Sequence, residues 1–379
     1  MKSQTTMTAR ASRDLIPCVA IPPGELLRDE LEARGWSQID FAAITGRPHQ
    51  TINEIVSGKK AITIETAVAF SSALGTTPQY WLNLENAYRL ALAQRDKPVN
   101  EEIRRRACIY SKAPVNELLR SHWIRVKNPK SNVELERAVC EFLEIGSIDQ
   151  EPCFELAARR SGDDPWNASH MAWFFRAKHM ARQESVKPYS KQHLKDNLKT
   201  IRNLCESVEA TRQVKKVLAG LGVRFVVVEH LPKTKIDGGS LWLDERSPVV
   251  ALSLRYDRLD YFWFTLMHEL SHILNEDSKP GKPRIDEQLC GSEAKSDQQA
   301  SKIEERANRD AAGWLIDPRE LDVLIQQHGT YVSAREIRAF ACKARVHPSI
   351  VVGQLQHRKI VPWTHFRGMS AKIRNEVMG

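Results

Sequence analysis

The sequence lacks long apolar runs, paired cysteines and low-complexity segments, and each absence narrows the class of protein. No run approaches the roughly 18 to 20 consecutive apolar residues that a membrane helix needs, so we expect no membrane partner. The seven cysteines are scattered without a C-x-x-C pair, which argues against a disulfide framework and a zinc–thiolate site. The first 18 residues contain no apolar core of the kind that secretory signals have. We therefore expect a cytoplasmic protein in a reducing compartment.

The length and the charge of the chain bear on the number of domains and on the kind of partner. A chain of 379 residues is long enough for two or three domains. The net charge is +9, and most of the basic excess lies in residues 96–220. A positive balance of this size is compatible with nucleic-acid binding but does not establish it.

Five short helices are predicted near the N-terminus. Gly24 opens the first, Ser37 is a plausible N-cap for the second, and Pro48 opens the third. Glycines stand where helices should stop or turn. The expected helices cover about residues 24–35, 38–44, 48–56, 63–75 and 78 onward.

The second and third of these helices, joined by a turn that contains Gly46, form a candidate helix-turn-helix. The third would enter the major groove, where Gln50 and Asn53 could read adenine through paired hydrogen bonds. Basic residues nearby could contact phosphates. The candidate DNA-binding residues are Gln38, His49, Gln50, Thr51, Asn53, Lys59 and Lys60. From periodicity alone, an ordinary helical bundle with a solvated polar face remains the alternative.

Residues 95–220 are predicted to be a helical, charged connecting region, and we assign no chemistry to them. The stretch from Met171 to Gln183 is amphipathic and rich in aromatic and basic residues. We expect Trp173, Phe174 and Ala177 to pack as core while the basic side chains point outward. A surface for nucleic acid or a partner is the alternative.

The pattern changes after residue 220. Three strands are predicted at “VRFVVVEHL”, “GGSLWLD” and “PVVALSL”, followed by a helix from about Leu259 to Asn275. On a helical wheel one face of this helix is core, and the other presents His268 and His272 one turn apart. This is the H-E-x-x-H arrangement, in which both histidines bind Zn²⁺ and Glu269 is the general base. A chance match is expected only about 0.03 times in a chain of this composition. Two core histidines satisfied by backbone carbonyls are the alternative.

A catalytic zinc needs a third protein ligand. The predicted helix in “SKIEERANRDAAGWLIDP” places Glu304 on one face with Ala307 and Ala311, which permit close approach of another helix. Glu304 is therefore the expected third ligand, and Glu305 is expected to face solvent. Asn308, one turn on, could hydrogen-bond to a metal ligand and orient it.

Two resemblances support these expectations. “SQIDFAAITGRPHQTINEIVSGKKAITIETAVAFSSALGTTPQYWLNLENAY” resembles the XRE-type helix-turn-helix of the HigA antitoxin family. Arg47 departs from the small apolar turn residue of that family, and could weaken the turn or contact a phosphate. The resemblance implies a homodimer that binds a palindromic double-stranded DNA operator.

“LPKTKIDGGSLWLDERSPVVALSLRYDRLDYFWFTLMHELSHIL”, followed by “IEERANRDAAGWLIDP”, resembles the ImmA/IrrE metallopeptidases. His268, Glu269, His272 and Glu304 fall on the ligand and base positions of that family. Asp310 and Gly313 depart from its ligand helix, and could loosen the packing beside Glu304. A group that stabilises the oxyanion is also expected, and its candidates are Tyr256, Arg258, Tyr261 and His347.

Together these features predict an α+β, predominantly α fold in three parts. Residues 20–94 form an all-α helix-turn-helix domain, residues 95–220 a helical connection, and residues 221–379 a zincin-like domain with a small β-sheet. The expected function is a DNA-binding regulator with a zinc-dependent endopeptidase that hydrolyses a specific regulator protein. The alternative is a non-enzymatic HigA-type antitoxin or repressor, whose peptidase-like domain senses a signal or binds a cognate toxin.

Overall fold

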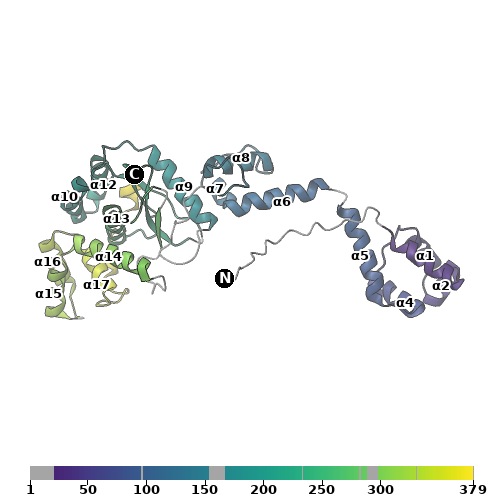
Figure 1. The fold of residues 1–379 in the computed structure, drawn as a ribbon. Coiled ribbons are helices and arrows are strands. Elements are labelled where there is room, and N and C mark those ends of the chain that lie inside the picture. The colour runs from purple at the N-terminus through teal and green to yellow at the C-terminus, as the bar shows by residue number, and fades with distance from the viewer. Residues whose placement is uncertain are drawn as a thin grey trace, which may run out of the picture. The chain divides into compact units, whose positions relative to one another are not determined.

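The computed structural model describes residues 21–94, 97–152, 167–232, 234–280, 283–287, 298–329 and 331–378 (Figure 1). The chain divides into two compact units, one up to Arg105 and one from Arg106 onward. Within the described ranges it is mostly helical with a single four-stranded sheet, so the expected fold class is confirmed. No helix of these ranges is both long and apolar enough to span a bilayer. The boundaries of the three predicted parts stay a prediction.

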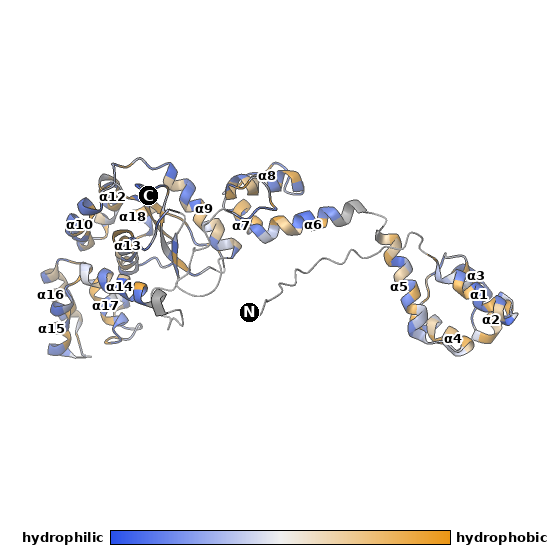
Figure 2. Cartoon of the chain, viewed as in Figure 1, coloured by the Kyte–Doolittle hydropathy of each residue, from blue (hydrophilic) through white to orange (hydrophobic). Residues whose placement is uncertain are grey.

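The N-terminal unit contains the five expected helices, with bounds close to those predicted. They are α1 (Pro23–Arg34), α2 (Gln38–Thr45), α3 (His49–Val56), α4 (Ile64–Leu74) and α5 (Pro78–Gln94). Helix α6 (Lys97–Lys112) follows and crosses the division between the units. Both α5 and α6 carry hydrophobic and hydrophilic residues along their lengths (Figure 2).

Local sequence signals explain where these helices begin and end. Ser37 and Asp40 form a capping box at the start of α2, and Gly46, with φ +65°, ends that helix. Gly24 is needed for close packing, because a Cβ there would lie 2.2 Å from the carbonyl oxygen of Ile55. The helices enclose a core that includes Phe41, Phe70 and Trp81. The helix-turn-helix therefore rests on its own packed core.

The C-terminal unit contains the remaining elements. Its first part holds α7 (Val115–Arg120), α8 (Asn132–Leu143), α9 (Ala168–Arg182), α10 (Lys191–Asp196), α11 (Leu198–Asn203), the 3₁₀ turns η1 (Leu204–Glu206) and η2 (Glu209–Gln213), and α12 (Val214–Gly220). Then follow β1 (Arg224–Val227), β2 (Ile236–Trp242), β3 (Pro248–Leu252), α13 (Leu259–Leu274), β4 (Arg284–Glu287) and α14 (Gln298–Leu315). Last come α15 (Pro318–His328), α16 (Ala334–Ala344), α17 (Pro348–His357), η3 (Arg367–Met369) and α18 (Arg374–Met378).

The sheet has the order β1-β3-β2-β4 and is covered by helices on both faces. Strands β1 and β3 are parallel, while β2 runs antiparallel to both β3 and β4. Because side chains alternate along a strand, Val250 and Leu252 join the core of α13, and Val249 and Ala251 join the core of α9. The sheet is thus buried on both sides, which explains the near-continuous apolar runs of β1 and β3.

Helix α9 covers the second face of the sheet. Trp173, Phe174 and Ala177 are buried as expected, and the Trp173 indole donates a hydrogen bond of 3.0 Å to the Val228 carbonyl. Helices α8 and α9 therefore share one core with the sheet, although the sequence placed them in a connecting region. Strand β4 was not predicted, because its four residues include only one apolar side chain, Ile285.

Candidate metal centre and helix-turn-helix surface

Helix α13 carries the H-E-x-x-H residues through the centre of the C-terminal unit. It packs against β2 and β3 on one side and against α14 and α17 on others. The face that presents His268, Glu269 and His272 is as inaccessible as the core face, since all three residues are fully buried. The second face is covered because α14 brings Ala307 and Ala311 against it, and both are fully buried, as small residues at a close helix contact should be.

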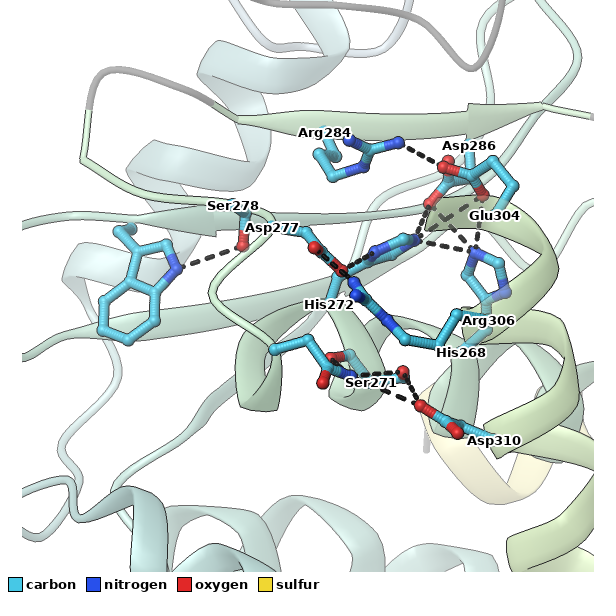
Figure 3. Close-up of polar contacts among 12 residues, drawn as sticks. His268, Ser271, His272, Asp277, Ser278, Arg284, Asp286, Glu304, Arg306 and Asp310 are labelled. Atoms are coloured by element: carbon cyan, nitrogen blue, oxygen red, sulfur yellow. Dashed lines mark hydrogen bonds and ion pairs between the residues drawn. The ribbon is translucent and has the colours of Figure 1, made fainter. Parts of the chain in front are cut away.

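Four side chains converge between α13, β4 and α14 (Figure 3). The Nε2 atoms of His268 and His272 lie 3.0 Å apart. Glu304 Oε2 lies 3.2 Å from Nε2 of His268 and 3.6 Å from that of His272. Asp286 Oδ2 lies 3.4 Å from each of the same two nitrogens. Two imidazoles and two carboxylates around one point form a group that could hold a metal ion.

Asp286 is the member of this group that the sequence did not identify. It lies on β4, where strand pairing with β2 places it opposite Gly238. The available signal was weak: the short charged segment “RIDE” begins 10 residues after the end of α13 and has no helical or alternating apolar pattern. Only the long-range register of β4 against β2 turns its carboxylate toward the histidines.

A second layer of polar side chains holds the group in place (Figure 3). His272 Nδ1 lies 3.0 Å from Asp277 Oδ2, and Arg306 donates to both oxygens of the same carboxylate. Arg284 donates to Glu304 Oε1 and leaves Oε2 toward the histidines. A carboxylate on Nδ1 fixes the imidazole so that Nε2 faces the centre of the group.

The pKa values of the group reflect its burial and its mixed charges. Burial raises the pKa of Glu304, but hydrogen bonds to His268 and His272 outweigh this and hold it at about 2. Burial lowers the pKa of His272, but its bonds to Asp277 and Asp286 raise it well above the ordinary value. Without a metal, therefore, protons on the imidazoles supply the positive charge that these carboxylates need.

Glu269 lies on the sheet side of α13. A Cβ added to Gly238 would stand 2.7 Å from Glu269 Oε1, so only glycine leaves room for this carboxyl beside β2. Burial and the neighbouring Asp286 carboxylate raise the pKa of Glu269 well above its ordinary value. A nearby cation would favour the ionised form that a general base requires.

The other residues singled out in this domain have different surroundings. The Asn308 side-chain oxygen is buried without a hydrogen-bond partner among the described residues, so its proposed orienting role stays a prediction. Asp310 accepts a 2.7 Å hydrogen bond from Ser271, and thereby joins α14 to α13 where looser packing was expected. Glu305 is exposed as expected. Gly313 has room for a side chain, since an added Cβ would approach Pro318 no closer than 3.8 Å.

The oxyanion candidates are engaged in contacts of their own. Arg258 donates to both oxygens of Asp260, and His347 Nδ1 accepts from the Ser349 backbone N–H at the start of α17. The rings of Tyr256 and Tyr261 lie 4.5 Å apart. None of these contacts reaches the four-residue group, so the choice among the candidates stays open.

The candidate DNA-binding residues lie on α3 and the segments beside it. His49, Gln50, Asn53, Lys59 and Lys60 are exposed, while Gln38 and Thr51 are half-buried. Gln50 donates a 3.0 Å hydrogen bond to Glu54, and Lys60 lies 3.3 Å from the Thr51 hydroxyl. Arg47 is half-buried in the turn between α2 and α3. The first turn of α3 is thus accessible to a ligand, although Gln50 and Thr51 also contact neighbouring side chains.

Comparisons with known proteins match both ends of the chain. Residues 27–81 match the helix-turn-helix family, and residues 223–351 match the family of IrrE N-terminal-like domains. The chain is 35% identical over 78 residues to an HTH-type transcriptional regulator, YddM, from Escherichia coli. The aligned region covers 21% of this chain and 83% of the relative. It is 34% identical over 68 residues to antitoxin HigA-1 of Vibrio cholerae, covering 18% of this chain and 64% of the antitoxin. A solved structure of the Pseudomonas aeruginosa antitoxin HigA with the higBA promoter aligns with a TM-score of 0.20 and 34% identity, over 20% of this chain and 83% of that one.

The contact between Asp277 and His272 yields a prediction about metal affinity. Asp277→Ala removes the carboxylate that orients the imidazole, and we expect the affinity for Zn²⁺ to fall by about 10- to 100-fold. Competition against a chromophoric chelator measures this change. Asp310→Ala is the matched control, because Asp310 also bonds to α13 but touches none of the four residues. Equal affinities for the two variants would show that Asp277 does not support the site.

Proposed function

The chain belongs to the XRE/HigA-like helix-turn-helix regulators through its N-terminal domain and carries an IrrE N-terminal-like peptidase domain, and from this premise we propose that it is a DNA-binding regulator with a zinc-dependent endopeptidase. The proposed substrate is a specific regulator protein, since the peptidase-like domain is joined to a regulator's DNA-binding domain. The proposed location is the cytoplasm, where both DNA and regulators are available.

One observation carries the enzymatic part of the proposal. The two histidines of H-E-x-x-H lie 3.0 Å apart at Nε2, with Glu304 Oε2 within 3.6 Å of both, in a buried group that could hold a metal. Buried ionised groups are costly unless they are paired or coordinate a metal. A mixed imidazole and carboxylate set is one that zinc accepts. We propose His268, His272 and Glu304 as zinc ligands.

Glu269 and Asp277 would have different roles in the proposed hydrolysis. A bound zinc ion lowers the pKa of water and polarises a carbonyl group. Glu269, next to His268 in sequence and buried against Gly238, would take a proton onto its carboxylate and pass it to the leaving amine. Asp277 would keep His272 in the orientation that directs Nε2 to the centre of the group.

The second candidate function is a non-enzymatic antitoxin or repressor. In this version the buried group holds a metal for structure, and the domain senses a signal or binds a toxin. The identity to an antitoxin favours it, and so does the burial of the group, since His268, His272 and Asp286 are wholly inaccessible. Both candidates need the metal, and only the first needs Glu269 as a base.

The proposed partner of the N-terminal domain is a double-stranded DNA operator. Support comes from the match to helix-turn-helix regulators and from the exposure of Gln50 and Asn53 on the first turns of α3. Lys59 and Lys60 would add phosphate contacts after that helix. We further propose a homodimer, because two copies of α3 are needed to read both halves of a palindromic site.

Variants of His268 and Glu269 separate metal binding from turnover. We expect the purified protein to contain about one zinc per chain. His268→Ala should lose the metal, whereas Glu269→Gln should keep it and lose cleavage, because the amide cannot accept the proton. Elemental analysis measures the first effect. Mass spectrometry of new protein termini in cells that express each variant measures the second. Cleavage that survives Glu269→Gln unchanged would remove the catalytic proposal and leave the antitoxin function.

Gln50 provides the test of the DNA-binding half. Gln50→Ala should weaken binding to DNA from upstream of its own gene by about 1–3 kcal/mol, as expected for the loss of one paired base contact. Fluorescence anisotropy of the full chain with labelled duplex measures this loss. Gln79→Ala is the matched control, because Gln79 is also exposed and also bonds one turn ahead, to Asn83 on α5. Failure of the intact protein to bind any such duplex would contradict this half of the proposal.

A further inference from the structure

The metal-holding group contains one carboxylate more than a zinc peptidase needs. Three protein ligands and one open position are the rule for catalytic zinc, whereas structural zinc is enclosed by four protein ligands. We propose that Asp286 is a fourth protein ligand, and that it closes the site until it is released. The ligand assignment rests on geometry alone, and its regulatory meaning rests on the proposed peptidase function.

The distances from Asp286 to the two histidines are those expected between neighbouring ligands of a four-ligand zinc shell. Zinc lies about 2.0–2.2 Å from histidine nitrogen and carboxylate oxygen, so neighbouring ligand atoms in a tetrahedron are about 3.3–3.6 Å apart. Asp286 Oδ2 stands 3.4 Å from Nε2 of both His268 and His272. Glu304 Oε2 stands at 3.2 and 3.6 Å from the same atoms, so the two carboxylates lie at similar distances from the two imidazoles. Asp286 therefore fits the fourth position as well as Glu304 fits the third.

Asp286 lies near Glu269 and Arg284 and raises the pKa of both, but its direct ion pairs are with the two imidazoles. Its side chain is fully buried, and neither of its oxygens has a hydrogen-bond partner among the described residues, apart from the ion pairs with the two imidazoles. Glu304 differs, because Arg284 neutralises its second oxygen. A buried carboxylate without such a partner is costly, and a cation at the centre of the group would compensate it.

The position of Asp286 also bears on Glu269. Asp286 pairs with Gly238 across β2 and β4, and Glu269 Oε1 lies against that same Gly238. The carboxylate of Asp286 thus stands on the side of the group that faces the general base. A water molecule that both the metal and Glu269 could reach would have to take this place. While Asp286 holds it, the site binds metal but does not hydrolyse.

Release of Asp286 would open the sheet only at its edge, where β4 pairs with β2. Strand β4 has four residues and, among the described residues, pairs with β2 alone, with a shift of register between Ile236 and Gly238 of β2. The contact of Arg284 with Glu304 is its polar link to α14. A partner that draws β4 away would therefore open one coordination position while His268, His272 and Glu304 keep the metal.

The full-length protein loaded with Co²⁺ tests this inference, because the visible spectrum of cobalt reports ligand number without any need for a substrate. We expect excess azide to leave the wild-type spectrum unchanged and to shift the spectrum of Asp286→Ala. The variant should also bind metal more than tenfold more weakly, since even the loss of an outer contact costs that much. Asp310→Ala, which alters a carboxylate outside the group, should behave as wild type. Asp286→Asn repeats the test with the shape of the side chain preserved.

Azide that shifts the wild-type spectrum as readily as that of Asp286→Ala would overturn the inference. An Asp286→Asn variant with unchanged affinity and unchanged response to azide would do the same. Other outcomes distinguish the role of Asp286 from the proposed peptidase function. A closed wild-type spectrum without cleavage by any variant keeps Asp286 as a ligand and removes the peptidase. An azide-sensitive wild type with Glu269-dependent cleavage keeps the peptidase and removes the closure.

Discussion

The structure of the C-terminal unit depends on how the charges of one group of buried side chains are compensated. Two imidazoles and the carboxyl groups of Glu269 and Asp286 are fully buried, and Glu304 lies at their edge. Such a group is unfavourable unless its members are paired or bind a cation. Protons on the histidines compensate part of the negative charge of the carboxylates, as the raised pKa of His272 indicates. A divalent cation would compensate this charge more fully, since the four candidate ligand atoms already lie within 4.8 Å of one another.

The fold around the group serves to bring three distant segments to one point. Helix α13 supplies both histidines, and the sheet fixes β4 through its pairing with β2. Helix α14 approaches closely because Ala307 and Ala311 are small, and it delivers Glu304. Gly238 leaves room for Glu269 beside the strand. Residues assigned by sequence to a connecting region support the same sheet, since Trp173 and its neighbours cover its other face. The site therefore depends on packing over most of the unit.

Local sequence patterns predicted the bounds of the first five helices and three of the four residues of the buried group. The caps and glycines of the first five helices act within a few residues, so the helix bounds followed from sequence. The spacing of His268 and His272 and the alanines beside Glu304 act within one helix each, which allowed three members of the group to be named. Asp286 and Asp277 could not be found in this way. The place of Asp286 is set by strand register, and that of Asp277 by the chain that leaves α13. Burial of α13 on both sides likewise depends on contacts between distant segments.

The central claim is that this buried group is a metal site, and thermal unfolding with and without a chelator tests it most directly. If zinc binds the folded chain and not the unfolded chain, its removal should cost several kcal/mol, about 4 kcal/mol where free metal exceeds the dissociation constant 1,000-fold. The account predicts a lower unfolding midpoint for the wild type after treatment with dipicolinate, restored by Zn²⁺, and no response of the His268→Ala variant. A wild-type midpoint that is the same with zinc, with chelator and with neither would contradict it.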